Sequence, residues 1–277
     1  MIKKILLPLE NSPYTNSALD YACFVAKRQD AVVTGGIFLD VEKINKSLGT
    51  IDKNFNIKWN NKIDPETIAN AKPTLEFLIH AFISKCENQK VKFNFEEEIG
   101  MPSSNISPIS NFYDLIVTGL KSDFSLIKKN FGSSFLLKII ETSATPVLAV
   151  PHSYRPTKNI VIAYDASLMA SRALQRFVHT ANFSDQSITI VSSSKNVTKG
   201  EENLKRAKEY LLAYGAKKVE TDLSRFEIKK VLKSSYFDFA DLIVLGVHSQ
   251  NIVKNIFVGS LTKQLILDAK KALFIGI

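Results

Sequence analysis

The sequence predicts an α/β protein made of two tandem, doubly wound domains, each built on a mainly parallel five-stranded sheet. The first observation is an internal repeat, because the segment DLIVTG at 114–119 returns almost unchanged as DLIVLG at 241–246. The second is that apolar, strand-like runs alternate with amphipathic helical patterns in both halves, which is typical of sheets covered by helices on both faces. The length of 277 residues suits two domains of ordinary size.

Further segments follow the same repeat. First strands are expected at 5–10 (ILLPLE) and 160–165 (IVIAYD), and each ends in an acidic residue. The pairs Gly132–Ser133 and Gly259–Ser260 each begin thirteen positions after the glycine that ends the repeated segment. We therefore expect domains at 1–151 and 158–277, joined by a short polar linker at 151–158 that contains two prolines.

The first copy is the longer one. Glu10 and Asp165 are 155 positions apart, whereas Gly119 and Gly246 are 127 apart, so the first copy holds about 28 extra residues before its fourth strand. The polar stretch 42–65, rich in Asn and Lys, is the expected place for most of them. We expect this insertion to form a loop or flap over one end of the first domain.

The elements of the first copy follow from local signals. Its first helix is expected to begin at Pro13 with Ser12 as the N-cap, because a hydroxyl followed by proline is typical of a helix start. Ala18, Ala22 and Ala26 then recur at helical spacing. The later elements are expected as a strand at 31–39, a long helix from Ile68 to Cys86, strands at 92–99 and 114–119, a helix after Ser133, and a strand at 146–150.

The second copy repeats this order with shorter elements. Its strands are covered by helices whose apolar residues recur at helical spacing, as in the first copy. The expected elements are strands at 160–165, 187–191, 218–223, 241–246 and 272–277, with helices from Leu204 to Leu212, from 226 to 239, and after Ser260.

Composition excludes several classes of protein. Hydrophobic residues make up 45% and charged residues 23%, which is typical of globular chains and excludes disorder. The apolar run at 5–9 is too short for a signal peptide or a membrane span, so we expect a cytoplasmic protein without a membrane partner. The net charge of +9 favours anions in general, but no basic run is interleaved with aromatics, so no specific nucleic-acid partner is expected.

The sequence contains no clear motif for metal binding or for catalysis. Cys23 and Cys86 lie among apolar residues of expected helices and are interpreted as buried, reduced thiols. The four histidines are scattered singly, so no metal site is expected. No nucleophile, base and acid are placed together, and we expect a binding protein rather than an enzyme, with slow hydrolysis of bound ATP left open.

The candidate site lies at the carboxyl ends of the strands of the second copy. Doubly wound, Rossmann-like sheets bind ligands there, because the strand order reverses at that edge. A glycine lets the backbone approach a phosphate, and the free N–H groups of a helix N-terminus stabilise its charge. The candidate residues are Ala163, Tyr164, Asp165, Ser192, Gly246, His248, Ser249, Gly259, Ser260 and Leu261. Two simpler interpretations stay open, namely that Asp165 only caps the following helix and that Gly259–Ser260 is only a turn.

These motifs resemble the universal stress protein family in its tandem form. The family's nucleotide-binding members carry G-x2-G-x9-G-[ST] after the fourth strand and an aspartate after the first. The second copy matches with Gly246, Gly259–Ser260 and Asp165, but has Ser249 in place of the middle glycine. The first copy matches less well, since it has Ser122 at that glycine and Glu10 as its acid.

The resemblance implies a stress-response protein that binds an adenine nucleotide. The expected ligand is ATP, with Mg²⁺ only if ATP is bound, and the better-preserved site is that of the second domain; the first domain has a degenerate site. It also implies a pseudo-dimer within the chain, paired through the last strands at 145–150 and 272–277, and leaves a homodimer open. The rival interpretation is a nucleotide-free scaffold or a small hydrophobic-ligand binder. The regulatory protein partner is not identified by the sequence.

Overall fold

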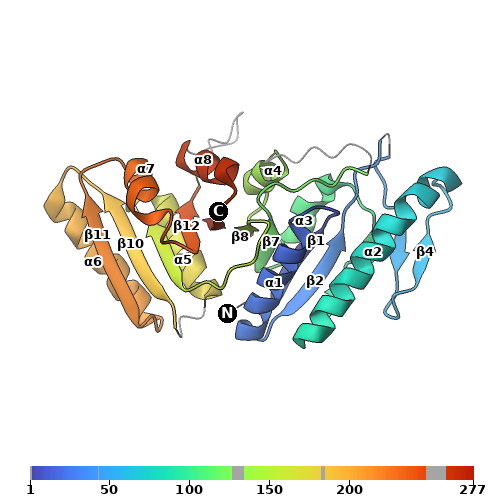
Figure 1. Cartoon of the computed structure of the whole chain (residues 1–277), viewed down its shortest axis with the longest axis horizontal. Coiled ribbons are helices and arrows are strands. Elements are labelled where there is room, and N and C mark those ends of the chain that lie inside the picture. The colour runs from blue at the N-terminus through green and yellow to red at the C-terminus, as the bar shows by residue number, and fades with distance from the viewer. Residues whose placement is uncertain (1, 43, 127–133, 182–184, 248–259) are drawn as a thin grey trace. The chain divides into compact units, whose positions relative to one another are not determined.

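The computed structural model describes residues 2–42, 44–126, 134–181, 185–247 and 260–277 (Figure 1). These residues form two compact units. The N-terminal unit contains residues 2–145 and 152–154, and the C-terminal unit contains residues 146–151 and 155–277. The predicted α/β fold class is confirmed, since parallel strands alternate with helices in both units. None of the helices in the described ranges is both long and apolar enough to cross a membrane.

The N-terminal unit is built on a parallel sheet whose strand order is β7-β1-β2-β5. Five of the six residues of β1 are buried, as expected for a central strand covered on both faces. The elements of this sheet and its helices are β1 (Lys4–Leu9), α1 (Thr15–Gln29), β2 (Val32–Ile37), α2 (Pro65–Gln89), β5 (Phe93–Phe95), η1 (Ser103–Asn105), α3 (Ile106–Ser110), β7 (Leu115–Gly119) and α4 (Ser134–Thr142).

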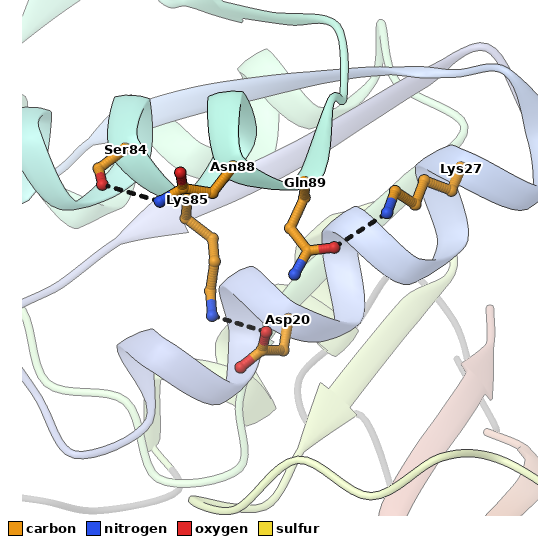
Figure 2. A network of polar contacts seen from close by, with 6 residues as sticks. All are labelled: Asp20, Lys27, Ser84, Lys85, Asn88 and Gln89. Atoms are coloured by element: carbon orange, nitrogen blue, oxygen red, sulfur yellow. Dashed lines mark hydrogen bonds and ion pairs between the residues drawn. The ribbon is translucent and has the colours of Figure 1, made fainter.

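The helices α1 and α2 lie side by side (Figures 1 and 2). The Lys85 ammonium lies 2.7 Å from the Asp20 carboxylate, and the Lys27 ammonium donates to the Gln89 side chain at 3.0 Å. Each pair joins a residue of α1 to a residue of α2 in the same order along the chain, so the helices run parallel. The two cysteines, at positions 23 and 86 of these helices, are free and buried, as the interpretation of buried, reduced thiols requires.

Two details of the N-terminal unit differ from the sequence-based expectation. The first helix begins at Thr15 instead of Pro13, because the Ser12 hydroxyl accepts from the Tyr14 N–H and closes a separate turn ahead of the helix. The single strand expected at 92–99 is two strands, β5 and β6 (Glu98–Ile99). It divides because its two ends pair with different sheets.

The second of these sheets contains the insertion. A hairpin of β3 (Gly49–Ile51) and β4 (Ile57–Trp59) pairs with β6 through β3, so the order is β4-β3-β6 with antiparallel pairing throughout. The polar stretch 42–65 is therefore an ordered hairpin rather than a plain loop. The hairpin joins the rest of its unit through β6, which follows β5 in the chain.

The C-terminal unit contains strands in the order β11-β10-β9-β12-β13-β8. Every pairing in it is parallel except that of β13 with β8, which is antiparallel. The elements are β9 (Asn159–Ala163), α5 (Leu168–Thr180), β10 (Ser187–Ser193), α6 (Val197–Ala213), β11 (Lys218–Ser224), α7 (Ile228–Val231), the π-helical turn η2 (Leu232–Tyr236), β12 (Leu242–Gly246), α8 (Ser260–Asp268), β13 (Ala272–Gly276) and β8 (Val147–Val150).

The strand β8 comes from the first copy of the repeat but is part of the C-terminal unit. Its residues pair with the last strand of the second copy, with Ala149 opposite Leu273 and Leu148 opposite Phe274. All four residues of β8 are buried. This antiparallel contact is the one expected between the last strands of the two copies.

Candidate functional site

A cavity of about 470 Å³ opens at the carboxyl ends of β9 and β12 in the C-terminal unit. These neighbouring parallel strands stand where the order reverses, because the chain continues from β9 to β10 on one side and returns to β12 on the other. The lining residues come from the strand ends, from the first turns of α5, α7 and α8, and from the residues just before α5 and α7. They are Ala163, Tyr164, Asp165, Ser167, Met169, Ala170, Ser193, Glu227, Ile228, Lys229, Leu245, Gly246, Leu261 and Thr262.

Asp165 is exposed and stands at the mouth of this cavity. Its Oδ1 accepts a hydrogen bond from the Ser167 N–H at 2.9 Å, and the Ser167 hydroxyl in turn caps α5 by accepting from the Ala170 N–H at 3.1 Å. Between them, Ala166 has φ of 59°, which an alanine rarely adopts. One carboxylate oxygen thus holds the turn before α5, and Oδ2 has no hydrogen-bond partner among the described residues.

Gly246 is the last residue of β12 and lines the cavity. Close packing explains why this position carries no side chain. A Cβ at this position would lie 2.5 Å from the Met169 carbonyl carbon and 2.7 Å from the Ala170 nitrogen. Both are backbone atoms of the first turn of α5, so they cannot move aside. The glycine therefore lets α5 begin directly against the end of β12, which brings the α5 and β9 side chains to the same cavity.

The serine prediction on β10 is off by one position with respect to this cavity. Ser192 is buried and does not line it, whereas Ser193 does, and the Ser193 hydroxyl donates to the Phe226 carbonyl at 2.7 Å. Successive side chains of a strand point to opposite faces, so only one of two adjacent serines can face the cavity. The missed lining residues Glu227 and Lys229 come from the start of α7, which the sequence indicates as a helix without indicating where it lies.

Part of the predicted site cannot be compared with the structure. His248, Ser249 and Gly259 lie outside the described residues, and so does the side chain of Ser260, the first residue of α8. The same holds for Gly132 and Ser133 of the first copy. Of the predicted residues that are described in full, Ala163, Tyr164, Asp165, Gly246 and Leu261 lie together around one cavity.

At the corresponding position of the N-terminal unit, the acid and the serine of the first copy are buried and hydrogen-bonded within the unit. Glu10 is only 2% exposed, and its Oε2 accepts a hydrogen bond from the Asp123 N–H at 2.6 Å. Ser122, which stands at the middle glycine of the family motif, is equally buried; its hydroxyl donates to the Gly119 carbonyl at 3.0 Å. A Cβ on Gly119 would lie 2.5 Å from the Tyr14 Cβ, so this glycine too is held by packing.

The segment after β7 continues across this end of the N-terminal unit. The Asp40 N–H donates to the Phe124 carbonyl at 2.6 Å, and the Phe124 ring packs against Phe38 and Phe135 with centroids 6.1 and 4.4 Å away. A degenerate first site stays a prediction, and these contacts favour it.

Burial dominates the electrostatics of Glu10. Because its carboxyl is removed from water, the pKa of Glu10 is raised to about 7, even though hydrogen bonds from Ser122 and Asp123 favour the charged form. Near neutral pH this carboxyl is therefore divided between its two protonation states. Among the described residues, no group of three or more His, Cys, Asp and Glu side chains is arranged to hold a metal ion.

Comparison with known proteins agrees with this architecture. No family model matches the chain. A curated universal stress protein from Synechocystis sp. is 22% identical over 287 aligned positions, which cover 96% of each chain. Among solved structures, a universal stress protein from Archaeoglobus fulgidus matches 98% of this chain and 95% of its own, with a TM-score of 0.68 and 20% identity.

Over nearly its whole length, this chain is similar to universal stress proteins. A putative universal stress protein from Pseudomonas aeruginosa also covers 99% of it, using 92% of its own length, with a TM-score of 0.62 and 13% identity. Both solved structures are matched over nearly their full length, so the likeness to universal stress proteins extends over both copies of the repeat. The resemblance inferred from the sequence motifs is confirmed at the level of fold and tandem organisation.

Proposed function

We propose that this chain is a cytoplasmic stress-response protein that binds an adenine nucleotide, ATP, as a regulatory ligand in the cavity of its C-terminal unit. The observation that carries the proposal is the contrast between the two copies. At one strand edge five residues singled out from the sequence line a cavity. At the corresponding edge of the first copy, Glu10 and Ser122 are buried and hydrogen-bonded within their own unit. The volume of about 470 Å³ falls in the range of ligand pockets.

The lining residues suit the parts of a nucleotide. The free oxygen of Asp165 can accept from a ribose hydroxyl or an adenine amino group. The N-terminus of the nine-residue helix α8, where Leu261 and Thr262 line the cavity, can stabilise phosphate charge. With ATP bound, Mg²⁺ would be held mainly by the phosphates, and Asp165 and Glu227 are the carboxylates of the lining that could complete its coordination.

The test is calorimetric titration of ATP into the full chain and into two asparagine variants. In Asp165→Asn the Oδ1 that accepts from the Ser167 N–H is kept while the charge is removed, so the turn before α5 should survive. We expect ATP affinity to fall about tenfold or more, the cost of a hydrogen bond to a charged group. Asp241→Asn is the matched control, because Asp241 accepts from the Lys158 and Asn159 N–H groups at the opposite end of the same sheet.

The outcomes separate the two interpretations of Asp165. If Asp165→Asn binds ATP as tightly as the unmodified chain while Asp165→Ala is destabilised, the residue is a cap and not a ligand. If the unmodified chain does not bind ATP, the rival function is favoured, that of a nucleotide-free scaffold or small hydrophobic-ligand binder. The apolar side chains of Met169, Leu245 and Leu261 in the lining suit that rival. Mass spectrometry of small molecules that copurify with the chain distinguishes them directly.

A further inference from the structure

A second cavity, of about 770 Å³, lies in the N-terminal unit along β5 and belongs to neither copy of the nucleotide motif. Its walls come from the turn of the inserted hairpin, from β5 and the two residues after it, from the start of β1, and from Tyr113, two residues ahead of β7. Without the insertion this cavity would lose one of its walls. It therefore needs an explanation that the repeat does not supply.

The hairpin turn places an aromatic ring at this cavity at a conformational cost. Phe55 has φ of 63° and its side chain remains 39% exposed. A bulky residue with positive φ is uncommon, and such strain is found most often at functional sites. The turn is held by Asp52, whose Oδ1 accepts from the Asn54 and Asn56 N–H groups at 2.8 and 2.9 Å, so the backbone that carries the ring is well determined.

The Phe55 ring extends an aromatic wall that β5 begins. It lies stacked on Phe93, with centroids 6.0 Å apart and an interplanar angle of 18°, and edge-on to Phe95 at 5.8 Å. All three rings line the cavity. Since Phe55 stays partly exposed, the wall presents ring surface that the protein itself does not cover. A flat apolar group is the chemistry that such a wall binds.

Charges of both signs stand next to this wall. The Lys4 ammonium lies 4.7 Å from the centre of the Tyr113 ring, and the hydroxyl of the same tyrosine donates to the Glu96 carboxylate. The desolvated Tyr113 hydroxyl, bonded to a carboxylate, has a raised pKa and stays a donor. Within the part of the chain that the structure describes, neither Lys4 nor Glu96 is held in an ion pair. Lys53 adds a further positive charge to the lining, and Glu97 and Asp52 add two negative ones, of which Asp52 is already bonded by the hairpin turn.

We propose that this cavity binds a small zwitterion with a flat ring, of the size and charge pattern of an aromatic amino acid. Its ring would lie against Phe55, its ammonium group would meet Glu96 or Glu97, and its carboxylate would meet Lys4 or Lys53. A simple anion or cation would leave one set of these charges without a counterpart. The cavity is in the other unit from the proposed nucleotide site, so each can fail without the other.

The test is calorimetric titration of L-phenylalanine into the full chain, with three analogues that each lack one feature. Phenethylamine lacks the carboxylate, 3-phenylpropionate lacks the ammonium group, and L-alanine lacks the ring. We expect saturable binding of L-phenylalanine and at least about tenfold weaker binding of each analogue, since each loses one charged hydrogen bond or the ring contact. Absence of L-phenylalanine binding at millimolar concentration overturns the proposal, and so does equal binding of all four compounds.

A variant pair separates ligand binding from a structural role of the ring. Phe55→Gly removes the ring and relieves the positive φ, so the turn should keep its form. Phe77→Ala is the matched control, because Phe77 is an exposed phenylalanine of α2 in the same unit and does not line the cavity. We expect L-phenylalanine affinity to fall at least about tenfold in Phe55→Gly and to stay unchanged in Phe77→Ala, with equal urea midpoints.

A second readout separates a loss of ligand binding from a loss of folding in these variants. Fluorescence of Trp59, on β4 of the same hairpin, reports whether the hairpin remains folded. Unchanged affinity in a folded Phe55→Gly variant contradicts the proposal. If that variant unfolds the hairpin, the double variant Glu96→Gln/Glu97→Gln, which keeps the shape of both side chains, replaces it; retained affinity in the double variant also contradicts the proposal.

Discussion

Replacement of Glu10 by glutamine should remove a large pH dependence from the stability of the N-terminal unit. The Glu10 carboxyl is buried, and its pKa is raised from 4.5 to about 7, mainly by burial. Glutamine has nearly the same shape, can still accept from the Asp123 N–H through its carbonyl oxygen, and carries no charge at any pH. The variant therefore isolates the energetic cost of ionising a carboxyl inside the fold.

The sign and size of the effect follow from this pKa. Because the folded state holds the proton more tightly than the unfolded state, Glu10 contributes stability that is fully present below about pH 4.5 and is lost as the pH rises through about 7. A difference of this size corresponds to about 3 kcal/mol. We expect the free energy of unfolding of the unmodified chain to fall by about 3 kcal/mol relative to Glu10→Gln between about pH 4 and about pH 8.

The assay is urea unfolding at a series of pH values, followed by the fluorescence of Trp59. This residue is the single tryptophan of the chain and lies on β4, so it reports the unit that contains Glu10. Glu87→Gln is the matched control, since it makes the same change at an exposed position of α2 and should follow the unmodified chain. Parallel pH profiles for Glu10→Gln and the unmodified chain would refute the reasoning.

Three further substitutions test the packing of the two units and the strength of one ion pair. Gly246→Ala places a Cβ 2.5 Å from the Met169 carbonyl carbon, so the C-terminal unit should lose about 1 to 3 kcal/mol or more, measured by thermal melts followed by circular dichroism. Leu75→Ala, at a fully buried position of α2, should cost about 2 to 5 kcal/mol in the Trp59 urea assay. Asp20→Asn breaks the partly exposed pair with Lys85 and should change stability by less than about 1 kcal/mol in the same assay; a larger loss would show that burial strengthens the pair.

The alternation of elements was predictable because it depends on local patterns. Apolar runs such as 5–9 and 242–245 become buried central strands, and the repeat reveals two copies without any knowledge of contacts. Boundaries were less predictable. Ser12 closes a turn instead of capping α1, and the strand expected at 92–99 divides between two sheets. In both cases a hydrogen bond to a distant or competing partner decides between local alternatives of similar energy.

The residues of the candidate site were likewise predictable from the sequence only in part. Asp165, Gly246 and Leu261 were found from the motif and its spacing, and they do lie around one cavity. Glu227 and Lys229 were missed, since nothing in the local sequence of α7 indicates which strand end it approaches. The sequence alone does not distinguish Ser192 from Ser193, because adjacent serines look alike, whereas the face that each presents depends on the register of β10 with β9.

The sequence by itself therefore determined the fold class and the tandem repeat, and it predicted the strand edge at which the cavity lies. These depend on hydrophobic periodicity and on motif spacing, which the chain carries locally. Only the tertiary structure decided that Glu10 is buried and bonded to Asp123, and that the inserted hairpin brings Phe55 beside β5. Such contacts join residues far apart in the chain, and their free energy comes from burial and packing that no local pattern records.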